Sequence, residues 1–439
     1  MSSVRSRREF LRIAAIAGAA LSIPAAAGAA PEFNWRRFAG TQLRFLAPSY
    51  GWTNDVIRPL LPQFEQLTGT KVAWEIYPED AFRQKLTIEM SSGSGAVDGF
   101  MSLTAYDGLR FAKAGWYEPL GQYVNNPTLT DPLFDFADFY PTLRAAATID
   151  GKLIGIPTAP EVQLLYYRKD VFQAHGLNPP RTLHALESDA KALTNKGDNF
   201  YGFLSRGKRA AAVYTFAPFL LNFGGRWLDQ TGKPALNTPA FISALTFYGG
   251  LIRQYGPPGG ANIGFYEVND LMAQGRAAMA TASNYTVGVL EDPNKSKVAG
   301  KIGYAPIPAG PAGTHSPLVT WVHSLSAQSK HKEAAWYFTQ WATSKDMMLR
   351  SARTKTPVGR LSVWDTPDFQ NSMPKGWLGA VNVALAQAYP NQINPLVASV
   401  PEVRDAIGEA IVSVIEGGDA ARAAAKAQQQ VVDIIRRAG

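Results

Sequence analysis

The sequence of 439 residues contains no cysteine. This absence excludes structural disulfides, iron–sulfur clusters, thiolate zinc sites and cysteine nucleophiles, and it also excludes a lipid anchor on an N-terminal cysteine. Histidine is scarce as well, and the five histidines stand at spacings that match no zinc-binding template. They are His175, His184, His315, His323 and His331. We therefore expect neither a metal site nor a cofactor.

Enzyme motifs are equally sparse. No serine or threonine follows any of the glycine–lysine pairs, so the phosphate-binding loop GxxxxGK[ST] is missing. The nucleophile elbow GxSxG and the zinc motif HExxH are also absent. We therefore expect a protein that is not an enzyme and that does not hydrolyse ATP itself.

Basic residues exceed acidic residues by a modest margin. The 43 Lys and Arg against 35 Asp and Glu give a formal charge of +8, which falls to +5 without the four arginines and one glutamate of residues 1–29. Segments that bind nucleic acid often contain a run of five to eight residues rich in Lys and Arg, and no such run occurs outside this leader. We expect no nucleic-acid partner and interpret the surplus charge as solvated surface.

The first residues form a segment typical of exported proteins. Arg7 and Arg8 precede an apolar, Ala-rich stretch that ends in the small-residue pattern Ala27-Gly28-Ala29. This is the pattern of a cleaved secretory signal, and the paired arginines resemble a twin-arginine signal. The alternative is a membrane anchor. Pro24 interrupts the stretch, which is short and weakly apolar, whereas a spanning helix needs about 20 strongly apolar residues.

No later segment approaches the length and hydrophobicity of a membrane span. We therefore expect residues 1–29 to be a cleaved twin-arginine signal and the mature protein to be soluble. A soluble exported protein without a lipid anchor needs an outer compartment to retain it. This requirement points to the periplasm of a Gram-negative cell.

Beyond the leader, short apolar strands alternate with amphipathic helices, which predicts an α/β fold with a parallel sheet and right-handed crossovers. Strands are expected at Gln42–Ala47, Lys71–Tyr77, Phe100–Leu103, Leu164–Tyr167, Lys301–Pro306 and Leu318–Ser326. Helices are expected from a Thr53 cap to Leu67, and at Glu79–Met90, 182–195, 209–222, Ile242–Tyr255, Lys332–Thr343 and in two tail segments separated by Gly417-Gly418. Pro59 and Pro62 are expected to bend or shift the start of the first helix.

Several of these stretches, in order along nearly the whole mature chain, resemble family 1 extracellular solute-binding proteins of ABC importers, the maltose-binding-like group. The similar segments are Phe64–Val72 (FEQLTGTKV), Lys85-Leu86 with Ser92–Asp98, Ala114–Leu120, Asp150–Lys152 with Gly155–Pro157 and Leu165–Phe172, Gly224–Asp229, Gly275–Met279, and Lys332–Phe338 with Trp341–Ser344. The chain departs from the family pattern at three positions, where Ala96, Gly99 and Arg168 replace the usual Pro, Val and Asn.

The resemblance implies a two-lobed periplasmic binding protein fold of type II, with the ligand cleft between lobes that are joined by a multi-crossing hinge. The implied lobes are residues 36–158 with 308–350, and residues 159–307 with 351–439. The implied crossings lie near Pro157–Gln163, Ala305–Gly310 and Arg350–Gly359. The resemblance also implies a monomer that binds a small sugar or polyol and docks on the transmembrane subunits of an ABC permease.

A sugar site needs aromatic rings for the apolar faces of the ligand, and side chains that hydrogen-bond its hydroxyls. The chain has 10 Trp, 17 Tyr and 22 Phe. Open α/β sheets bind ligands at the carboxyl ends of their strands, so the candidates are residues in strand-end loops and near the hinge. They are Trp52, Glu79, Asp80, Tyr106, Asp107, Glu161, Gln163, Asn284, Tyr285, Trp321, His323 and Arg360.

Each candidate also has a purely structural alternative. Glu79, Asp80 and Asp107 could serve only in the first turns of helices, which favour acidic residues. His323 could be a buried structural histidine, and Arg360 could pair with a carboxylate across the hinge.

Two other functions stay open at this point. An exported glycan hydrolase would need two carboxylates about 5–10 Å apart, and the candidate acids could supply them. A protein of the same fold could also bind a polyamine or another charged solute. A set of acids, amides and one arginine favours a neutral sugar or sugar alcohol.

Overall fold

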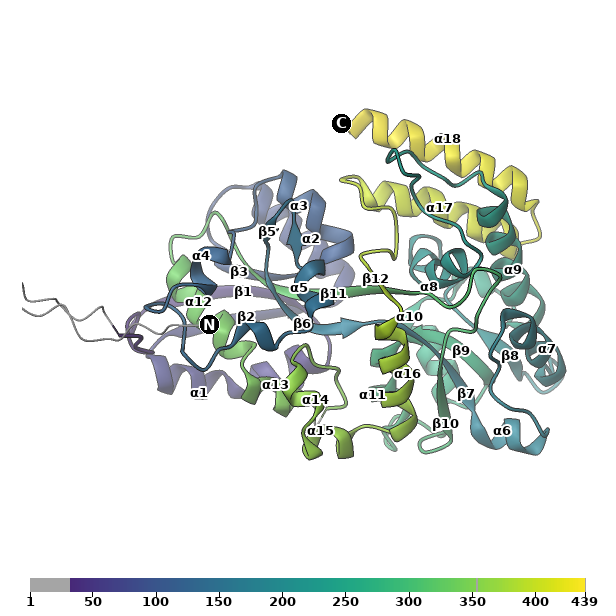
Figure 1. Ribbon diagram of the computed structural model, residues 1–439, viewed down its shortest axis with the longest axis horizontal. Helices are drawn as coiled ribbons and strands as arrows, with labels where there is room; N and C mark the ends of the chain where they lie inside the picture. Colours follow the sequence, from purple (N-terminus) through teal and green to yellow (C-terminus); the bar gives the residue numbers. More distant parts are fainter. Residues whose placement is uncertain (1–31, 353, 439) are drawn as a thin grey trace, which may run out of the picture. The chain divides into compact units, whose positions relative to one another are not determined.

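Two β-sheets organise the chain in the computed structural model, which describes residues 32–352 and 354–438. The predicted signal sequence, residues 1–29, lies outside the described residues. The two sheets with their helices make an α/β, two-lobed structure, as the sequence predicts (Figure 1).

The first sheet has six strands. They are β1 (Gln42–Pro48), β2 (Lys71–Tyr77), β3 (Gly99–Leu103), β6 (Ile156–Glu161), β11 (Ser316–Leu325) and β12 (Ala388–Pro390). Their order is β12-β11-β3-β1-β2, and β6 also pairs with β11. The first three strands are parallel as expected, but β11 runs antiparallel to β3 and to β6. The sheet is therefore mixed, because β11 enters it from the second sheet rather than through a helical crossover.

The second sheet has four strands. They are β7 (Gln163–Arg168), β8 (Tyr201–Leu204), β9 (Ala277–Ser283) and β10 (Ile302–Pro306), in the order β10-β7-β9-β8. Only β8 and β9 are parallel, while β7 is antiparallel to both of its neighbours. A separate hairpin pairs β4 (Thr148–Ile149) with β5 (Lys152–Leu153).

Helices cover both sheets. The α-helices are α1 (Arg58–Thr68), α2 (Glu79–Ser91), α3 (Leu109–Lys113), α4 (Gly121–Val124), α5 (Pro141–Ala146), α6 (Lys169–Ala174), α7 (Leu183–Leu193), α8 (Arg209–Asn222), α9 (Pro239–Tyr255), α10 (Phe265–Ala273), α11 (Val287–Leu290), α12 (Lys332–Ala342), α13 (Lys345–Ala352), α14 (Leu361–Trp364), α15 (Pro367–Ser372), α16 (Lys375–Ala386), α17 (Val400–Ile415) and α18 (Ala420–Ala438). Single turns of π-helix or 3₁₀-helix are η1 (Trp52–Ile57), η2 (Thr104–Gly108), η3 (Phe136–Asp138), η4 (Gly260–Asn262) and η5 (Asn284–Thr286).

The start of the first helix differs from the prediction. Thr53 does not cap it, because its hydroxyl donates to the Pro48 carbonyl and accepts from the Tyr50 N–H inside the turn η1. The π-helical turn places Pro59 in the first turn of α1, where a missing N–H costs nothing. The prolines therefore shift the start of the α-helix to Arg58, as expected.

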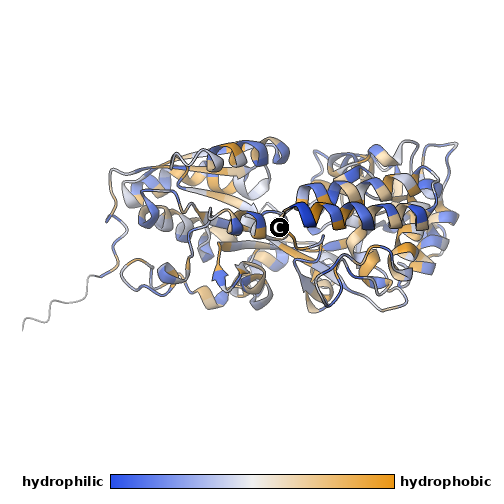
Figure 2. Cartoon of the chain, turned by 90° about the horizontal axis from the view of Figure 1, so that it is seen from above, coloured by the Kyte–Doolittle hydropathy of each residue, from blue (hydrophilic) through white to orange (hydrophobic). Residues whose placement is uncertain are grey.

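The C-terminal helices pack on the second sheet's helices. One side of α17 is buried against α8 and α9, and α18 packs on α17 through Ala424, Ala427 and Val431. In Figure 2, α18 lies toward the viewer and its visible side is largely hydrophilic. The helix therefore shows the amphipathic pattern from which it was predicted.

The chain passes between the two sheets at Val162, where β6 ends and β7 begins. Asn284 fixes this passage: its Oδ1 accepts from the Val162 N–H at 3.2 Å and its Nδ2 donates to the Pro160 carbonyl at 3.1 Å. A second passage leads from β10 into β11. Both lie near the crossings implied by the sequence.

The lobe boundaries stay a prediction, but the contacts at the third implied crossing bear on them. Arg360 donates hydrogen bonds to the carbonyls of Phe134, Asp135 and Thr343. All three residues lie in the segments predicted to form the first lobe. The helix α16, in contrast, packs on β10 and β7 of the second sheet. These contacts favour a passage between α15 and α16, later than the predicted Arg350–Gly359.

Within residues 32–352 and 354–438, no helix combines the length and the apolar character that a membrane span requires.

Candidate ligand-binding site

Three aromatic rings from the two sheets and their loops surround the ring of Tyr50. The Tyr50 ring is roughly parallel to Trp52 and Trp321, with ring centroids 6.4 and 6.2 Å away, and it meets Tyr285 edge-on at 6.1 Å. Tyr50 and Trp52 follow β1, Trp321 lies in β11, and Tyr285 lies in η5 at the end of β9. The structure therefore brings together Trp52, Trp321 and Tyr285, three of the predicted residues.

Several polar atoms beside these rings are buried without a partner. The Trp52 Nε1, the Tyr285 hydroxyl, the Tyr214 hydroxyl and the Gln163 Oε1 have no hydrogen bond among the described residues. Nearly all buried polar groups in proteins are hydrogen-bonded, and an unpaired one costs about 1–3 kcal/mol. These atoms therefore need partners from solvent or from a bound solute.

Glu161 is the acidic member of this group. Glu161 is a half-buried residue at the end of β6, and burial raises the pKa of its carboxyl. The charge of Arg206 and the neighbouring hydroxyls of Tyr214 and Ser283 oppose that rise. Burial also holds the pKa of the Tyr214 and Tyr285 hydroxyls well above the ordinary value, so both stay protonated as hydrogen-bond donors.

The first-lobe side of the site is organised by Arg83, on α2. Its guanidinium lies over the Tyr106 ring at 4.1 Å and over the Trp321 ring at 5.2 Å. It forms an ion pair with Asp107 and donates to Glu79 Oε1 at 2.9 Å. Asp107 is fully buried and also accepts from the Leu103 N–H. Asp107 and Glu79 thus hold Arg83 between two aromatic rings.

The predicted acids at the start of α2 lie at the edge of this arrangement. The side chain of Glu79 is half-exposed, and Asp80 is exposed. Burial would raise the pKa of Glu79, but the charge and hydrogen bond of Arg83, with Arg206 and Arg404 farther off, lower it. Both carboxylates influence the hydroxyl of Tyr266 on α10, so they face the second lobe.

Three predicted residues already use most of their hydrogen-bonding groups within the protein. Asn284 uses both ends of its amide at the passage between the sheets. Gln163 donates to the Tyr214 carbonyl and keeps only its Oε1 free. Arg360 lies among Phe134, Phe139 and Asp138, and its donors go to Asp138 and to backbone carbonyls. We leave Arg360 out of the proposed site.

His323 lies behind the Trp52 ring rather than at the site. Its imidazole is fully buried, stacks on Trp74 at 5.8 Å, and bonds Thr339 through Nδ1 at 2.9 Å. Burial lowers its pKa to about 3. The histidine is therefore neutral in the folded protein, and it supports Trp52, whose ring meets it edge-on at 6.2 Å.

This buried histidine predicts an acid-sensitive fold. Because the folded pKa of about 3 lies below the ordinary value of 6.5, stability is fully present above pH 6.5 and falls as the pH drops toward 3. Between pH 7 and pH 5 we expect His323 to cost about 2 kcal/mol of unfolding free energy. Urea titrations at both pH values measure this drop in unfolding free energy. The drop should be smaller in His323→Leu than in the wild type, and it should be unchanged in His184→Leu, a substitution at an exposed position.

Sequence reasoning missed Tyr50, Arg83, Arg206, Tyr214 and Arg404. Tyr50 and Arg206 follow β1 and β8, so the strand-end rule that selected other candidates could have found them. Arg83 stands four residues after Glu79 on the same helix, a spacing that signals an ion pair. Tyr214 and Arg404 lie inside helices, where nothing in the local sequence distinguishes them from packing residues.

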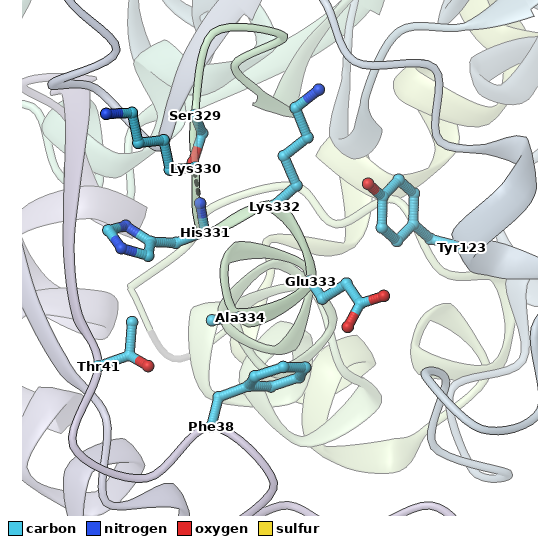
Figure 3. Close-up of a pocket in the computed structure, with 9 residues that line it drawn as sticks. All are labelled: Phe38, Thr41, Tyr123, Ser329, Lys330, His331, Lys332, Glu333 and Ala334. Atoms are coloured by element: carbon cyan, nitrogen blue, oxygen red, sulfur yellow. Dashed lines mark hydrogen bonds between the residues drawn. The ribbon is translucent and has the colours of Figure 1, made fainter.

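A separate cavity of about 360 Å³ lies at the start of α12, as Figure 3 shows. Its lining is Phe38, Thr41, Tyr123, Ser329, Lys330, His331, Lys332, Glu333 and Ala334. Its polar side chains are largely engaged: Lys332 pairs with Glu118 at 2.7 Å, and His331 contacts Asp98 at 3.2 Å. This cavity has no group of buried unpaired atoms like that around Tyr50.

Across the described part of the chain, no group of three or more acidic or histidine side chains is arranged to hold a metal ion.

The comparison with known families identifies the class of protein. The family described as bacterial extracellular solute-binding protein matches residues 50–349, more than half of the chain. The chain belongs to this family, and its fold is that of the two-lobed type II periplasmic binding proteins. Members of the family are extracellular or periplasmic binding proteins of ABC transporters.

Similar proteins carry names that refer to sugar alcohols. The chain is 30% identical over 303 residues to a mannitol-binding protein of Pseudomonas aeruginosa, which covers 66% of this chain and 67% of that protein. It is 29% identical to an erythritol/L-threitol-binding protein of Mycolicibacterium smegmatis, over 82% of each chain. A solute-binding protein of Agrobacterium radiobacter K84, solved in complex with ribitol, superposes with a TM-score of 0.82 at 27% identity, over 90% of this chain and 99% of that one.

Proposed function

We propose that this protein captures a sugar or sugar alcohol, with sugar alcohols favoured, and delivers it to the permease of an ABC importer. The relatives named above for mannitol and for erythritol and threitol, and the neighbour solved with ribitol, support this class of solute. The proposal places the protein in the periplasm as a monomer, exported through a cleaved twin-arginine signal within residues 1–29.

The observation that carries the proposal is the set of unpaired polar atoms among the four rings. The hydroxyls of Tyr214 and Tyr285 and the Trp52 Nε1 offer donors, while Glu161 and the Gln163 Oε1 offer acceptors. A polyol carries a hydroxyl on every carbon, and each hydroxyl both donates and accepts. Rings such as Tyr50 supply a surface for the C–H face of the same chain. Few other small solutes match both features.

Binding residues come from both sheets, which favours capture by closure. Tyr50, Trp52 and Trp321 belong to the first sheet and its loops, whereas Tyr285 follows β9 of the second sheet and Tyr214 lies on α8. A solute that contacts both sets stabilises the closed form relative to the open one. The closed form would then dock on the permease, whose separate ATPase subunits drive transport. In this proposal the protein itself performs no catalysis.

A thermal-shift screen tests the proposal. Hexitols, pentitols, tetritols, monosaccharides, disaccharides, amino acids and polyamines are added in turn to the purified protein. A solute that binds only the folded state at 100 times its Kd adds about 2.7 kcal/mol of stability, so we expect a clear rise in Tm with a sugar alcohol. Glu161→Gln should reduce that rise, whereas Glu416→Gln, at the exposed end of α17, should not.

A shift with polyamines or amino acids alone would overturn the solute class and leave the family assignment standing. Turnover of a chromogenic glycoside would support the hydrolase alternative instead.

A further inference from the structure

Three arginines converge at the edge of the proposed site. Arg83 comes from α2, Arg206 follows β8, and Arg404 lies on α17. Arg83 and Arg404 both lie over the Tyr106 ring, at 4.1 and 5.3 Å. Arg206 lies over the Tyr214 ring at 4.5 Å, and its charge acts on both Glu79 and Arg404. The three guanidiniums therefore form one group at the edge of the proposed site, on elements of both lobes.

The carboxylates nearby leave two of these guanidiniums unpaired. Arg83 is in ion pairs with Glu79 and Asp107, and Asp107 also lies 3.5 Å from Arg110. No ion pair of Arg206 or Arg404 with a carboxylate is present among the described residues. With Asp80 and Glu161, four carboxylates and four guanidiniums lie in this region, but the ion pairs of these carboxylates go to Arg83 and Arg110.

Arg404 is the most unusual member, because its side chain is only 7% exposed. It donates to the Asn394 Oδ1 at 3.0 Å and to the Ala210 carbonyl at 2.6 Å, but its Nε has no partner. Burial lowers its pKa to about 10, and the charges of Arg83 and Arg206 add to that effect. Buried cations are normally paired with an anion, since an uncompensated charge away from water is costly.

We infer that the site accepts, besides sugar alcohols, polyols whose terminal carbon is a carboxylate, and that this carboxylate binds between Arg206 and Arg404. The inference rests on the proposed function, since it concerns the same site. Charge-assisted hydrogen bonds from guanidinium to carboxylate are roughly twice as strong as neutral ones. Arg404 would contribute its unpartnered Nε–H and its charge, and Arg206 would contribute a guanidinium that forms no ion pair among the described residues. The polyol hydroxyls of such a sugar acid would still meet the hydroxyls and acceptors near Tyr50.

Titration calorimetry on matched pairs of solutes tests this inference. Ribitol is compared with D-ribonate and D-mannitol with D-mannonate, on the purified full protein. We expect the sugar acid of at least one pair to bind about 10-fold more tightly than its sugar alcohol. Arg206→Gln should abolish that preference. Because Arg206 is half-exposed and its side chain forms no hydrogen bond with the described residues, the variant should keep the Tm of the wild type.

The control is Arg253→Gln, which removes the same charge from an exposed position on α9 and should leave the preference intact. Arg404→Gln repeats the test at the buried position, with its Tm measured beside it. Equal or tighter binding of the sugar alcohols would overturn the inference and leave the proposed function standing. A preference for sugar acids that survives Arg206→Gln would overturn the assignment of the subsite. Binding of neither solute class would overturn the proposed function as well.

Discussion

Tyr285→Ala is expected to weaken the binding of the preferred sugar alcohol by about 100-fold. The substitution removes both an unpaired buried hydroxyl and the ring that meets Tyr50 edge-on at 6.1 Å. Loss of one hydrogen bond accounts for about 10-fold, and loss of the ring surface accounts for the rest. Tyr285→Phe should therefore lose only the first part. Calorimetric titration of both variants separates the two contributions.

The control for this prediction is Tyr255→Ala, a half-buried tyrosine at the end of α9 that lies near Glu187 instead. Its affinity should match that of the wild type. Because Tyr285 is itself only half-buried, Tyr285→Ala should stay folded. Trp321→Ala tests the same site from the first sheet, and normal binding by both variants would show that the site lies elsewhere.

Arg360→Met is expected to lower the unfolding free energy by about 3–5 kcal/mol. The guanidinium is 1% exposed and donates to the carbonyls of Phe134, Asp135 and Thr343, as well as to Asp138 at 3.2 Å. Methionine fills a similar volume but leaves the Asp138 carboxylate and these carbonyls without their donor. Urea unfolding at pH 7 measures the loss.

Arg350→Met provides the comparison, since Arg350 forms an exposed pair with Asp346 one helical turn away. Surface pairs of this kind contribute at most about 1 kcal/mol. We expect Arg360→Met, where it remains folded, to bind the solute normally. A loss of affinity without a loss of stability would place Arg360 back in the site, as the sequence alone suggested.

Most elements of the fold follow from the sequence because their patterns are local. The strand at Lys71–Tyr77 and the helix at 209–222 were predicted with the observed bounds, and the other elements that were predicted differ mainly at their ends. What local patterns could not reveal was the direction of β11. An antiparallel strand between β3 and β6 depends on pairing with residues more than 150 positions away in the chain, and the local sequence of the strand does not record that pairing.

The site was predictable only where a residue follows a strand, lies at the implied hinge or falls in a segment that resembles the family. Trp52 and Tyr285 were found in this way, Glu161 was found at the implied hinge crossing and Trp321 through the family resemblance, and the structure places all four near Tyr50 or beside its neighbours. Arg404 could not be found, because its role depends on the placement of α17 against Tyr106. His323 shows the opposite error, because it was predicted to contact the ligand but is a buried structural residue. Its hydrogen-bond partner, Thr339, could be recognised only from the fold.

The position of β11 also constrains how the chain is made. The first sheet lacks its central strand β11 until the residues from 316 onward have been synthesised. During that time the edge of β3 that will pair with β11 stays unpaired. Contacts this far apart in sequence slow folding and lengthen the time during which unpaired strands can aggregate. The twin-arginine export proposed above moves proteins that are already folded, so it would let this slow step finish in the cytoplasm, where chaperones are available, before the protein crosses the membrane.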